Sequence, residues 1–266
     1  IGQYLPKETL ISGFSLFNLK SKNHTNASNA ILTTDRFSKE VAFKVDLEDS
    51  TFKIGAMAKG AGMINPAMAT MLCFITTDAN IPKDDMKELL NECVQNTFNA
   101  ISVDGDTSTN DSVFLMTNKK SKAYNKEAFK MALNLVMKKL SIDILKDGEG
   151  SSKVVAFEVI GAKNNNEAMV CAKALSNSLL VKTALFGCDP NWGRIASTIG
   201  SCGICADSNT LKIYIGGIIV YDCQKIYFEN EEKTAKIMKM EDFKITCNLG
   251  IGDGKFTAYG CDLGYK

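Results

Sequence analysis

Lys59-Gly-Ala-Gly-Met-Ile-Asn-Pro-Ala-Met-Ala-Thr-Met-Leu72 joins a glycine loop to a junction of small residues. The glycines of the loop allow positive φ angles and a close approach of the backbone to another group. The stretch then reaches Ala69 and Thr70, directly before an apolar run that predicts a buried strand. A threonine hydroxyl becomes a good nucleophile when its own α-amino group is free to act as a base, which requires cleavage of the peptide bond before it. Thr70 therefore has two readings: an ordinary threonine at the start of a core strand, or a nucleophile released by cleavage of the Ala69–Thr70 bond.

Length and composition narrow the class of protein. The 266 residues are enough for one large domain or two small ones. The content of 45% hydrophobic and 23% charged residues is ordinary for a soluble globular protein, and the net charge of +1 gives no general attraction to nucleic acid or to an anionic membrane. No apolar run is long enough to span a bilayer, and no secretory signal pattern opens the sequence. The first residue is Ile1 rather than methionine, so we expect both ends to be cuts through a longer protein.

Cysteine and histidine usage argues against the commonest catalytic and metal sites. The nine cysteines are odd in number and scattered, which favours free thiols in a reducing compartment. Cys202 and Cys205 form a lone C-x-x-C with no second ligand pair, so we expect small buried residues beside a glycine turn rather than a zinc or redox site. The only histidine, His24, lies in a polar stretch that predicts a surface loop. A covalent catalyst would therefore need another base, which a free threonine amine would supply.

Hairpins mixed with helices, without a strict βαβ rhythm, predict an α+β fold with mixed or antiparallel sheets layered with helices. Apolar residues sharing one helical face predict helices, several of them opened by a capping residue. Helices are predicted at 7–20 (a short amphipathic element), after Pro82 to Phe98, from an Asn125 cap to Lys146, at 167–185 and at 231–240. Strands are predicted at 41–47, from Phe52 into the Lys59 loop, after Thr70, at 154–160, 243–249 and 256–259, with a hairpin at 211–220 turned at Gly216 and Gly217.

Three polar or glycine-rich stretches resemble known binding motifs only in part. Val103–Asp111 is acidic like a calcium loop, but its glycine is misplaced and no glutamate closes it. We interpret it as a polar turn whose side chains bond backbone amides. Gly250–Gly254 is no dinucleotide fingerprint because no helix follows it. Asp189–Arg194, which carries the only tryptophan, is interpreted as a rigid turn with Arg194 as a structural anchor.

Several unrelated motifs, taken in order, resemble the ornithine acetyltransferase (glutamate N-acetyltransferase) family over nearly the whole chain. The self-cleavage signature of that family corresponds to the Lys59–Leu72 stretch followed by Phe74–Ala79. The other matching stretches are Ile1–Gln3 with Leu5-Pro6, Ile31–Asp35, Val103–Asp111, Asp147–Gly150, Asp189–Arg194 and Gly260–Leu263.

The resemblance implies an N-terminal-threonine-nucleophile acetyltransferase of arginine biosynthesis. Cleavage before Thr70 would divide the chain into 1–69, the C-terminal part of an α chain, and 70–266, a β chain lacking its C-terminal end. The cleaved pairs would assemble as α2β2. The acetyl group would pass from N2-acetyl-L-ornithine to L-glutamate through an acetyl-threonine ester. No metal or organic cofactor is implied, although some members of the family accept acetyl-CoA as a substrate. The implied location is the cytoplasm, or the mitochondrial matrix in a fungus.

The substrate-binding and catalytic positions of the family match Lys59, Thr70, Glu149 and one threonine of the Thr33-Thr34 pair. The spacing to Lys59 favours Thr33. Lys59 would hold a carboxylate or the developing charge, and Glu149 an ammonium group of the amino-acid substrate. Without the resemblance, a surface lysine and a solvated loop acid are the simpler readings. The sequence has Arg36 where the family often has a threonine, which puts the local geometry around Thr33 in doubt. The oxyanion-hole Thr-Gly pair would precede this chain, and a substrate-binding Asn and Thr would follow it.

Two other functions remain open at this point. A related N-terminal-nucleophile amidohydrolase or aminopeptidase would use the same threonine, with water in place of glutamate as the acceptor. An inactive fragment would bind amino acids without turnover. Acetyl transfer to labelled glutamate distinguishes the acetyltransferase from the amidohydrolase or aminopeptidase. A single uncut chain with no covalent acetylation would support the inactive fragment.

Overall fold

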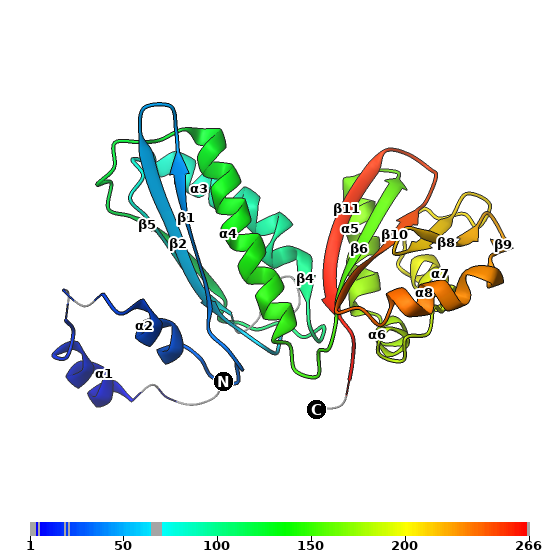
Figure 1. The fold of residues 1–266 in the computed structure, drawn as a ribbon, viewed down its shortest axis with the longest axis horizontal. Helices are drawn as coiled ribbons and strands as arrows, with labels where there is room; N and C mark the ends of the chain where they lie inside the picture. Colours follow the sequence, from blue (N-terminus) through cyan, green and yellow to red (C-terminus); the bar gives the residue numbers. More distant parts are fainter. Residues whose placement is uncertain (1–3, 5, 19, 21, 65–70, 265–266) are drawn as a thin grey trace.

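Two separate sheets organise the chain in this computed structural model, which describes residues 4, 6–18, 20, 22–64 and 71–264. Each sheet carries its own helices, so the described chain forms two lobes that meet below α4 (Figure 1). The first hydrophobic core lies between the first sheet and its helices, and the second lies within the second lobe. The mixed strand directions confirm the α+β fold with mixed sheets that the sequence predicts.

The first lobe has a four-stranded sheet in the order β1-β2-β3-β5. β1, β2 and β3 are antiparallel neighbours, and β5 lies parallel to β3. Alternate residues such as Phe52 and Ile54 are buried because α3 and α4 cover that face of the sheet (Figure 1). The elements of this lobe are β1 (Lys39–Asp46), β2 (Thr51–Lys59), β3 (Leu72–Thr77), α3 (Lys83–Asn96), η1 (Phe98–Ala100), β5 (Ser112–Thr117) and α4 (Lys126–Lys146).

The second lobe has a seven-stranded sheet in the order β4-β11-β6-β10-β7-β8-β9. β6 pairs in parallel with β10 and antiparallel with β11, and α5 packs against β6 and β11. The elements are β4 (Ile101–Ser102), β6 (Val154–Ala162), α5 (Asn165–Asn177), α6 (Leu179–Phe186), α7 (Trp192–Ser201), β7 (Lys212–Ile215), β8 (Ile218–Asp222), β9 (Lys225–Ile226), η2 (Phe228–Asn230), α8 (Glu231–Ile237), β10 (Asp242–Asn248) and β11 (Gly254–Cys261).

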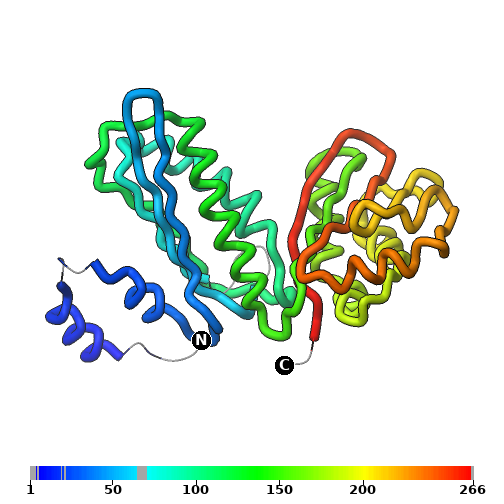
Figure 2. Tube along the Cα trace, in the orientation of Figure 1, coloured from blue at the N-terminus to red at the C-terminus, as the bar shows by residue number. Residues whose placement is uncertain are grey.

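The chain returns to the junction of the lobes after β11. Figure 2 shows the end of β11, in red, beside the green loop that follows α4. The Gly264 N–H donates to the Gly150 carbonyl at 3.0 Å, which fastens the end of the described chain to that loop. A Cβ at Gly150 would lie 3.1 Å from the Gly264 carbonyl oxygen, so the close approach of the two backbones favours glycine there.

Most predicted elements are confirmed, but the predicted helix over 167–185 is two helices. Ser178 has φ −64° and ψ 115°, an extended conformation that ends α5, and its side chain accepts a hydrogen bond from the Val181 N–H to open α6. The two helices meet at 55°. Apolar residues continue across the break, which is why spacing alone did not show it. Among the described residues no single helix is long and apolar enough to cross a membrane, and only this bent pair passes that test, by length and composition alone.

The N-terminal part of the described chain forms two short helices, α1 (Lys7–Phe14) and α2 (His24–Ala30). His24 begins α2 instead of lying in a loop, because Asn23 accepts a hydrogen bond from the Asn26 N–H and caps the helix. The His24 ring is exposed and contacts the Glu40 carboxylate. The exposed position of His24 is as predicted. The predicted loop is wrong, because His24 is the first residue of a helix.

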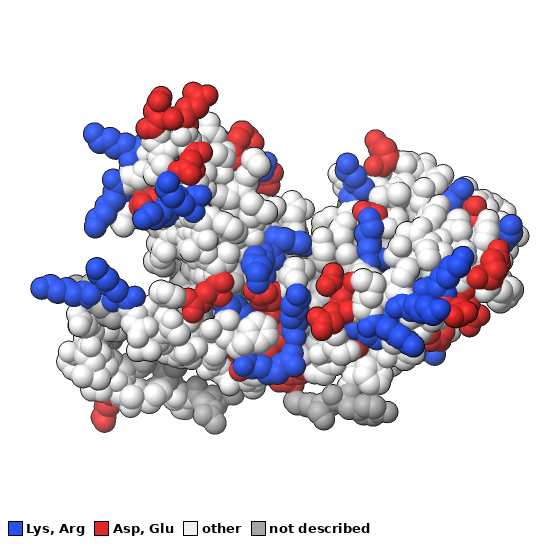
Figure 3. Space-filling view, viewed as in Figure 1, with Lys and Arg blue, Asp and Glu red and all other residues white. Residues whose placement is uncertain are grey.

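Charges of both signs occur on the face shown in Figure 3. Blue Lys and Arg side chains alternate with red Asp and Glu side chains over both lobes, without a broad patch of one sign among the residues drawn in colour. This distribution fits the net charge of +1.

Candidate active site

A cavity of about 290 Å³ gathers residues from four separate segments of the chain. Thr33, Lys59 and Glu149, the substrate-binding residues expected from the resemblance, all line it. The other lining residues are Thr34, Ala61, Gly62, Met63 and Asp104. Residues up to 116 positions apart in the sequence thus share one cavity, which brings together three of the four predicted site residues.

Lys59 is buried, with 6% of its surface exposed, so the simpler reading of a surface lysine is wrong. It ends β2, where it pairs with Leu72 of β3, and its Nζ donates to Thr33 Oγ1 at 3.0 Å. Of the two threonines in the Thr33-Thr34 pair, Thr33 is therefore the one bonded to Lys59. A buried ammonium beside a hydroxyl is a suitable partner for a substrate carboxylate.

Glu149 reaches the cavity from the loop after α4 and remains exposed at its rim. Its backbone N–H donates to the Ala61 carbonyl at 3.0 Å, which joins this loop to the glycine loop. A Cβ at Gly62 would lie 3.4 Å from Glu149 Cδ, so the glycine lets the carboxylate lie against the backbone. The exposure agrees with a solvated acid, but its position on the cavity places the carboxylate where a ligand would contact it.

A fully buried ion-pair network of Lys39, Asp35 and Asp147 joins segments that line the cavity. Lys39 Nζ lies 2.8 Å from Asp35 Oδ1 and 2.5 Å from Asp147 Oδ2, and all three side chains are closed to solvent. Asp35 also accepts the Gly60 N–H at 2.6 Å. Burial alone would raise the pKa of Asp35, but the hydrogen bonds from Lys39 and from the Gly60 and Thr33 amides outweigh burial and lower it.

Arg36, where the sequence departs from the family pattern, joins the same network. Its backbone N–H and its Nε both donate to Asp147, at 3.0 Å and 2.9 Å from Oδ1. Asp147 ends α4, so the guanidinium also reaches the Lys146 carbonyl. Arg36 therefore fastens the segment that carries Thr33 to the loop that carries Glu149.

The polar loop 103–111 contacts the backbone on both sides of residues 65–70. Asp104 accepts the Ile64 N–H at 2.9 Å and also the Met63 N–H, and Asp111 accepts the Met71 N–H at 2.6 Å. This confirms the interpretation of a turn whose side chains bond backbone amides. Among the described residues, no group of three His, Cys, Asp or Glu could hold a metal ion.

Asp111 ends the Val103–Asp111 stretch, which the sequence predicts to be a polar turn, but no role of its own was predicted for this residue. Burial raises the pKa of its carboxyl group from 3.8 to about 7, more than the Met71 amide and the charge of Lys59 lower it. Perturbed carboxyl groups beside a cavity are candidates for functional residues.

Thr70 and the Ala69–Thr70 bond lie outside the described residues. Their nearest described neighbours in the chain are Ile64 and Met71. A Cβ at Gly60 would lie 3.3 Å from Ile64 Cδ1 and 3.7 Å from Met71 Cα, so both neighbours pack against that glycine. The predicted nucleophile thus directly precedes a residue that lies beside Gly60, the neighbour of Lys59 in the chain.

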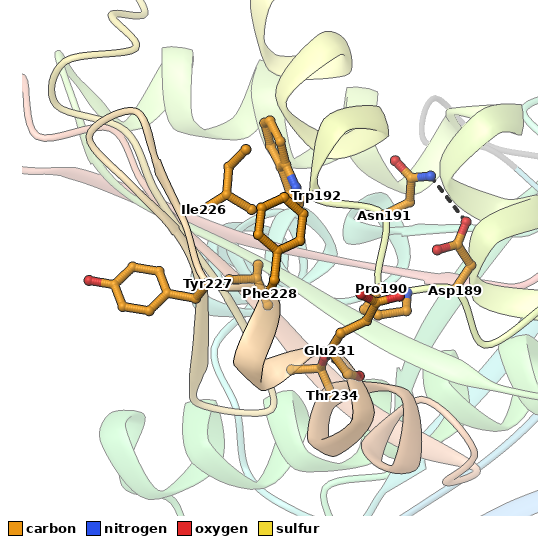
Figure 4. A pocket seen from close by; sticks show the side chains of 10 residues that line it. Asp189, Pro190, Asn191, Trp192, Ile226, Tyr227, Phe228, Glu231 and Thr234 are labelled. Carbon is orange, nitrogen blue, oxygen red and sulfur yellow. Dashed lines mark hydrogen bonds between the residues drawn. The ribbon is translucent and has the colours of Figure 1, made fainter.

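The Asp189–Arg194 motif lies in the second lobe, beside a different cavity of about 200 Å³. Figure 4 shows the Trp192, Ile226 and Phe228 side chains around this cavity, with the Asn191 amide bonded to Asp189. Arg194 Nη1 donates to the Leu180 carbonyl and to Thr183 Oγ1, both at 2.9 Å. Arg194 is a structural anchor, as predicted, and the motif also opens α7, with Asn191 as its cap.

The C-x-x-C pair is only partly as expected. Gly203 between the two cysteines has a φ of 75°, which confirms a glycine turn. Cys202 is half-buried and Cys205 is exposed, so the expectation that both are buried is wrong. The turn follows the end of α7 at the surface, which leaves Cys205 in contact with solvent.

Comparison with known proteins identifies relatives over the whole chain. The ArgJ family model matches residues 1–266. The chain is 62% identical to the arginine biosynthesis bifunctional protein ArgJ of Wolinella succinogenes, over 100% of this chain and 68% of that protein. It is 42% identical to the glutamate N-acetyltransferase of Methanocaldococcus jannaschii, over 94% of this chain and 66% of that protein.

The fold agrees with a solved structure. The crystal structure of the arginine biosynthesis bifunctional protein ArgJ from Bacillus halodurans superposes with a TM-score of 0.66 at 39% sequence identity. The match covers 71% of this chain and 92% of the chain in the crystal.

Replacing Lys39 by methionine should destabilise the protein strongly. The substitution keeps the aliphatic stem but leaves Asp35 as a buried carboxylate without its cation and Asp147 with Arg36 as its remaining cation, at a cost of about 3–5 kcal/mol. Lys44→Met on the same strand is the matched control, because Lys44 and Asp46 are both more than half exposed and such pairs contribute about 0–1 kcal/mol. Urea unfolding of both variants measures the two costs, and equal costs would contradict the role of the network.

Asp111 should make the stability depend on pH. Because its pKa is raised in the folded state, the folded protein binds the proton more tightly than the unfolded chain, and stability falls as the pH rises from about 4 through about 7. Asp111→Asn should therefore lose less stability than the parent between about pH 5 and about pH 8. Asp106→Asn, an exposed aspartate of the same loop, should keep the parental pH dependence in urea unfolding. An unchanged slope for Asp111→Asn would show that this carboxyl group is not the source.

Proposed function

Because this chain belongs to the ArgJ family over its whole length, we propose that it is an acetyltransferase of arginine biosynthesis whose acetyl carrier is Thr70. It moves an acetyl group from N2-acetyl-L-ornithine to L-glutamate. The relative from Methanocaldococcus jannaschii, named a glutamate N-acetyltransferase, supports glutamate as the acceptor.

The observation that carries this proposal is the cavity formed by Thr33, Lys59 and Glu149. An amino-acid substrate brings a carboxylate and at least one ammonium group, and burying either without a partner is costly. Lys59 supplies a buried cation bonded to Thr33, and Glu149 supplies an anion at the rim. The two charges complement a zwitterion.

Thr70 first has to be released from the chain. Its Oγ attacks the carbonyl carbon of Ala69, the peptide C–N bond breaks, and an ester forms while the hydroxyl proton passes to the departing nitrogen. Water then hydrolyses the ester, which leaves an Ala69 carboxylate, a restored Thr70 hydroxyl and a free Thr70 amine. The free Thr70 amine then acts as the general base. His24, the one histidine of the sequence, does not take this role, because its ring is exposed and contacts Glu40.

Acetyl transfer then follows in two steps: acetylation of Thr70 by the donor, and transfer of the acetyl group from Thr70 to glutamate. The Thr70 amine takes the proton of Oγ as Oγ attacks the acetyl carbonyl of acetylornithine, and ornithine leaves with that proton on its α-amine. The α-amine of glutamate attacks the resulting ester, its proton returns through the Thr70 amine to Oγ, and acetylglutamate leaves. No step requires a metal or an organic cofactor. Acetyl-CoA would enter as an alternative acetyl donor.

The β2–β3 ladder supports the continued association of the two pieces after cleavage. β2 precedes Thr70 and β3 follows it, and the two strands pair from Ile54 with Thr77 to Lys59 with Leu72. The pieces 1–69 and 70–266 therefore each contribute strands to one sheet. We propose that two such cleaved pairs assemble as α2β2. The relatives come from bacteria and an archaeon, which supports a cytoplasmic location rather than a mitochondrial one.

Thr70→Ala should abolish both cleavage and acetyl transfer in the full-length protein. The parent should run as two pieces on a denaturing gel, and the variant as one, because alanine has no hydroxyl to attack the preceding carbonyl. Transfer of acetyl from acetylornithine to labelled glutamate should be lost with it. Thr76→Ala, an exposed threonine of β3, is the control and should be cut and active. Cleavage of Thr70→Ala at the parental rate would rule out this mechanism.

Glu149→Gln should impair catalysis without preventing cleavage. The amide keeps the shape of the side chain but removes the anion that faces the substrate ammonium, which should lower kcat/KM by about 30-fold, equivalent to roughly 2 kcal/mol. The melting temperature should stay near that of the parent because the side chain is exposed. Glu127→Gln, at an exposed position of α4, should behave like the parent in steady-state kinetics. Parental kcat/KM in Glu149→Gln would remove this residue from the site.

A further inference from the structure

One polar loop holds the backbone on each side of the segment that contains the proposed scissile bond. This loop, residues 103–111, connects β4 to β5. The bonds come from its first and last carboxylates, Asp104 and Asp111, whereas Asp106 lies between them with an exposed side chain. The loop makes turn bonds of its own, from the Asp106 N–H to Asp104 Oδ1 and from the Asn110 N–H to Ser108 Oγ. Asp104 and Asp111 also accept amides that lie outside the loop.

Asp111 and its neighbour hold the C-terminal side. Asp111 Oδ1 accepts the Met71 N–H at 2.6 Å, and the Ser112 N–H donates to the Met71 carbonyl at 3.0 Å. Both polar backbone groups of Met71 are thus bonded to β5 or its first flanking residue. The Met71 N–H belongs to the peptide group that joins Met71 to Thr70, so Asp111 contacts the peptide group next to the nucleophile.

Asp104 and its neighbours hold the N-terminal side. Its carboxylate accepts the Met63 and Ile64 amides, while the Val103 N–H and Ser102 Oγ donate to the Ile64 carbonyl at 2.6 Å and 3.2 Å. Met63 has a φ of 57°, a left-handed backbone conformation that residues other than glycine rarely adopt. The two bonds to Asp104 stabilise this turn where the chain leaves the glycine loop.

We propose that Asp104 and Asp111 are positioning residues for self-cleavage, which fix the backbone of Ile64 and Met71, the nearest described residues on either side of the proposed cleavage site. This inference rests on the proposed cleavage at Ala69–Thr70. An intramolecular attack depends on the separation and orientation of the reacting groups, and small displacements of either lower its rate steeply. Because one loop holds both Ile64 and Met71, and both contact Gly60, these two residues cannot separate without breaking these bonds.

The two carboxylates have different roles after cleavage. Asp104 then bonds residues of the other piece, since Met63 and Ile64 precede the cut. Asp111 bonds Met71 of its own piece, the residue that directly follows the new N-terminal threonine in the chain. Loss of Asp111 should therefore lower kcat of the cleaved enzyme as well as the cleavage rate.

Four variants of the full-length protein test the proposal in a time course of self-cleavage. Asp104→Ala and Asp111→Ala should each be cut roughly ten- to a hundredfold more slowly than the parent, with melting temperatures close to it. Asp111→Asn should recover most of the rate, because the amide oxygen can accept the same Met71 N–H. Asp106→Ala is the matched control from the same loop and should be cut at the parental rate.

The outcomes separate this inference from the proposed function. Parental cleavage rates in a folded Asp111→Ala and in Asp104→Ala would overturn the inference, even if Thr70→Ala remains uncut. A slow Asp111→Asn, no faster than Asp111→Ala, would also overturn the role of the hydrogen bond. If Asp111→Ala does not fold, Asp104→Ala decides, because its exposed side chain leaves the core unchanged. Cleavage of Thr70→Ala would refute the proposed mechanism itself.

Discussion

The buried ammonium of Lys39 is the interaction on which the site depends. It lies between Asp35 and Asp147, which are 112 positions apart, and all three side chains are closed to water. A charge buried in this way is tolerated only with close partners, so the two aspartates must stay within reach of it. Asp35 in turn accepts the Gly60 amide, and Asp147 accepts two groups of Arg36. The cation therefore joins the segments that carry Thr33, Lys59 and Glu149.

Carboxylate-to-amide bonds, rather than side-chain packing, give the loops of the site their shape. Glycine loops have little apolar surface to bury, and their backbone amides need acceptors. Asp35 supplies one for Gly60, Asp104 for Met63 and Ile64, and Asp111 for Met71. A site on loops is less rigid than a site on helices and strands, and such bonds restore the rigidity that catalysis requires.

The second lobe contributes to the same site without lining the cavity. Lys182 of α6 is buried and donates to the Val103 carbonyl at 2.9 Å and to the Cys261 carbonyl at 2.8 Å. Val103 begins the loop that carries Asp104 and Asp111, so α6 and the end of β11 support that loop from the other lobe. The seven-stranded sheet is therefore part of the scaffold of the active site.

Local sequence patterns determined the elements, and motifs determined the family and the candidate residues. Alternation predicted β1, an apolar run predicted β3, and an asparagine cap predicted the start of α4, because these patterns depend on residues a few positions apart. The tertiary structure alone decided the rest. Apolar spacing passed unbroken across Ser178, where backbone conformation ended α5. The Lys39–Asp147 pair and the Asp111–Met71 bond join residues 108 and 40 positions apart. No local pattern encodes such contacts, because they form only when burial brings distant segments together and makes a lone charge or amide too costly to leave unpaired.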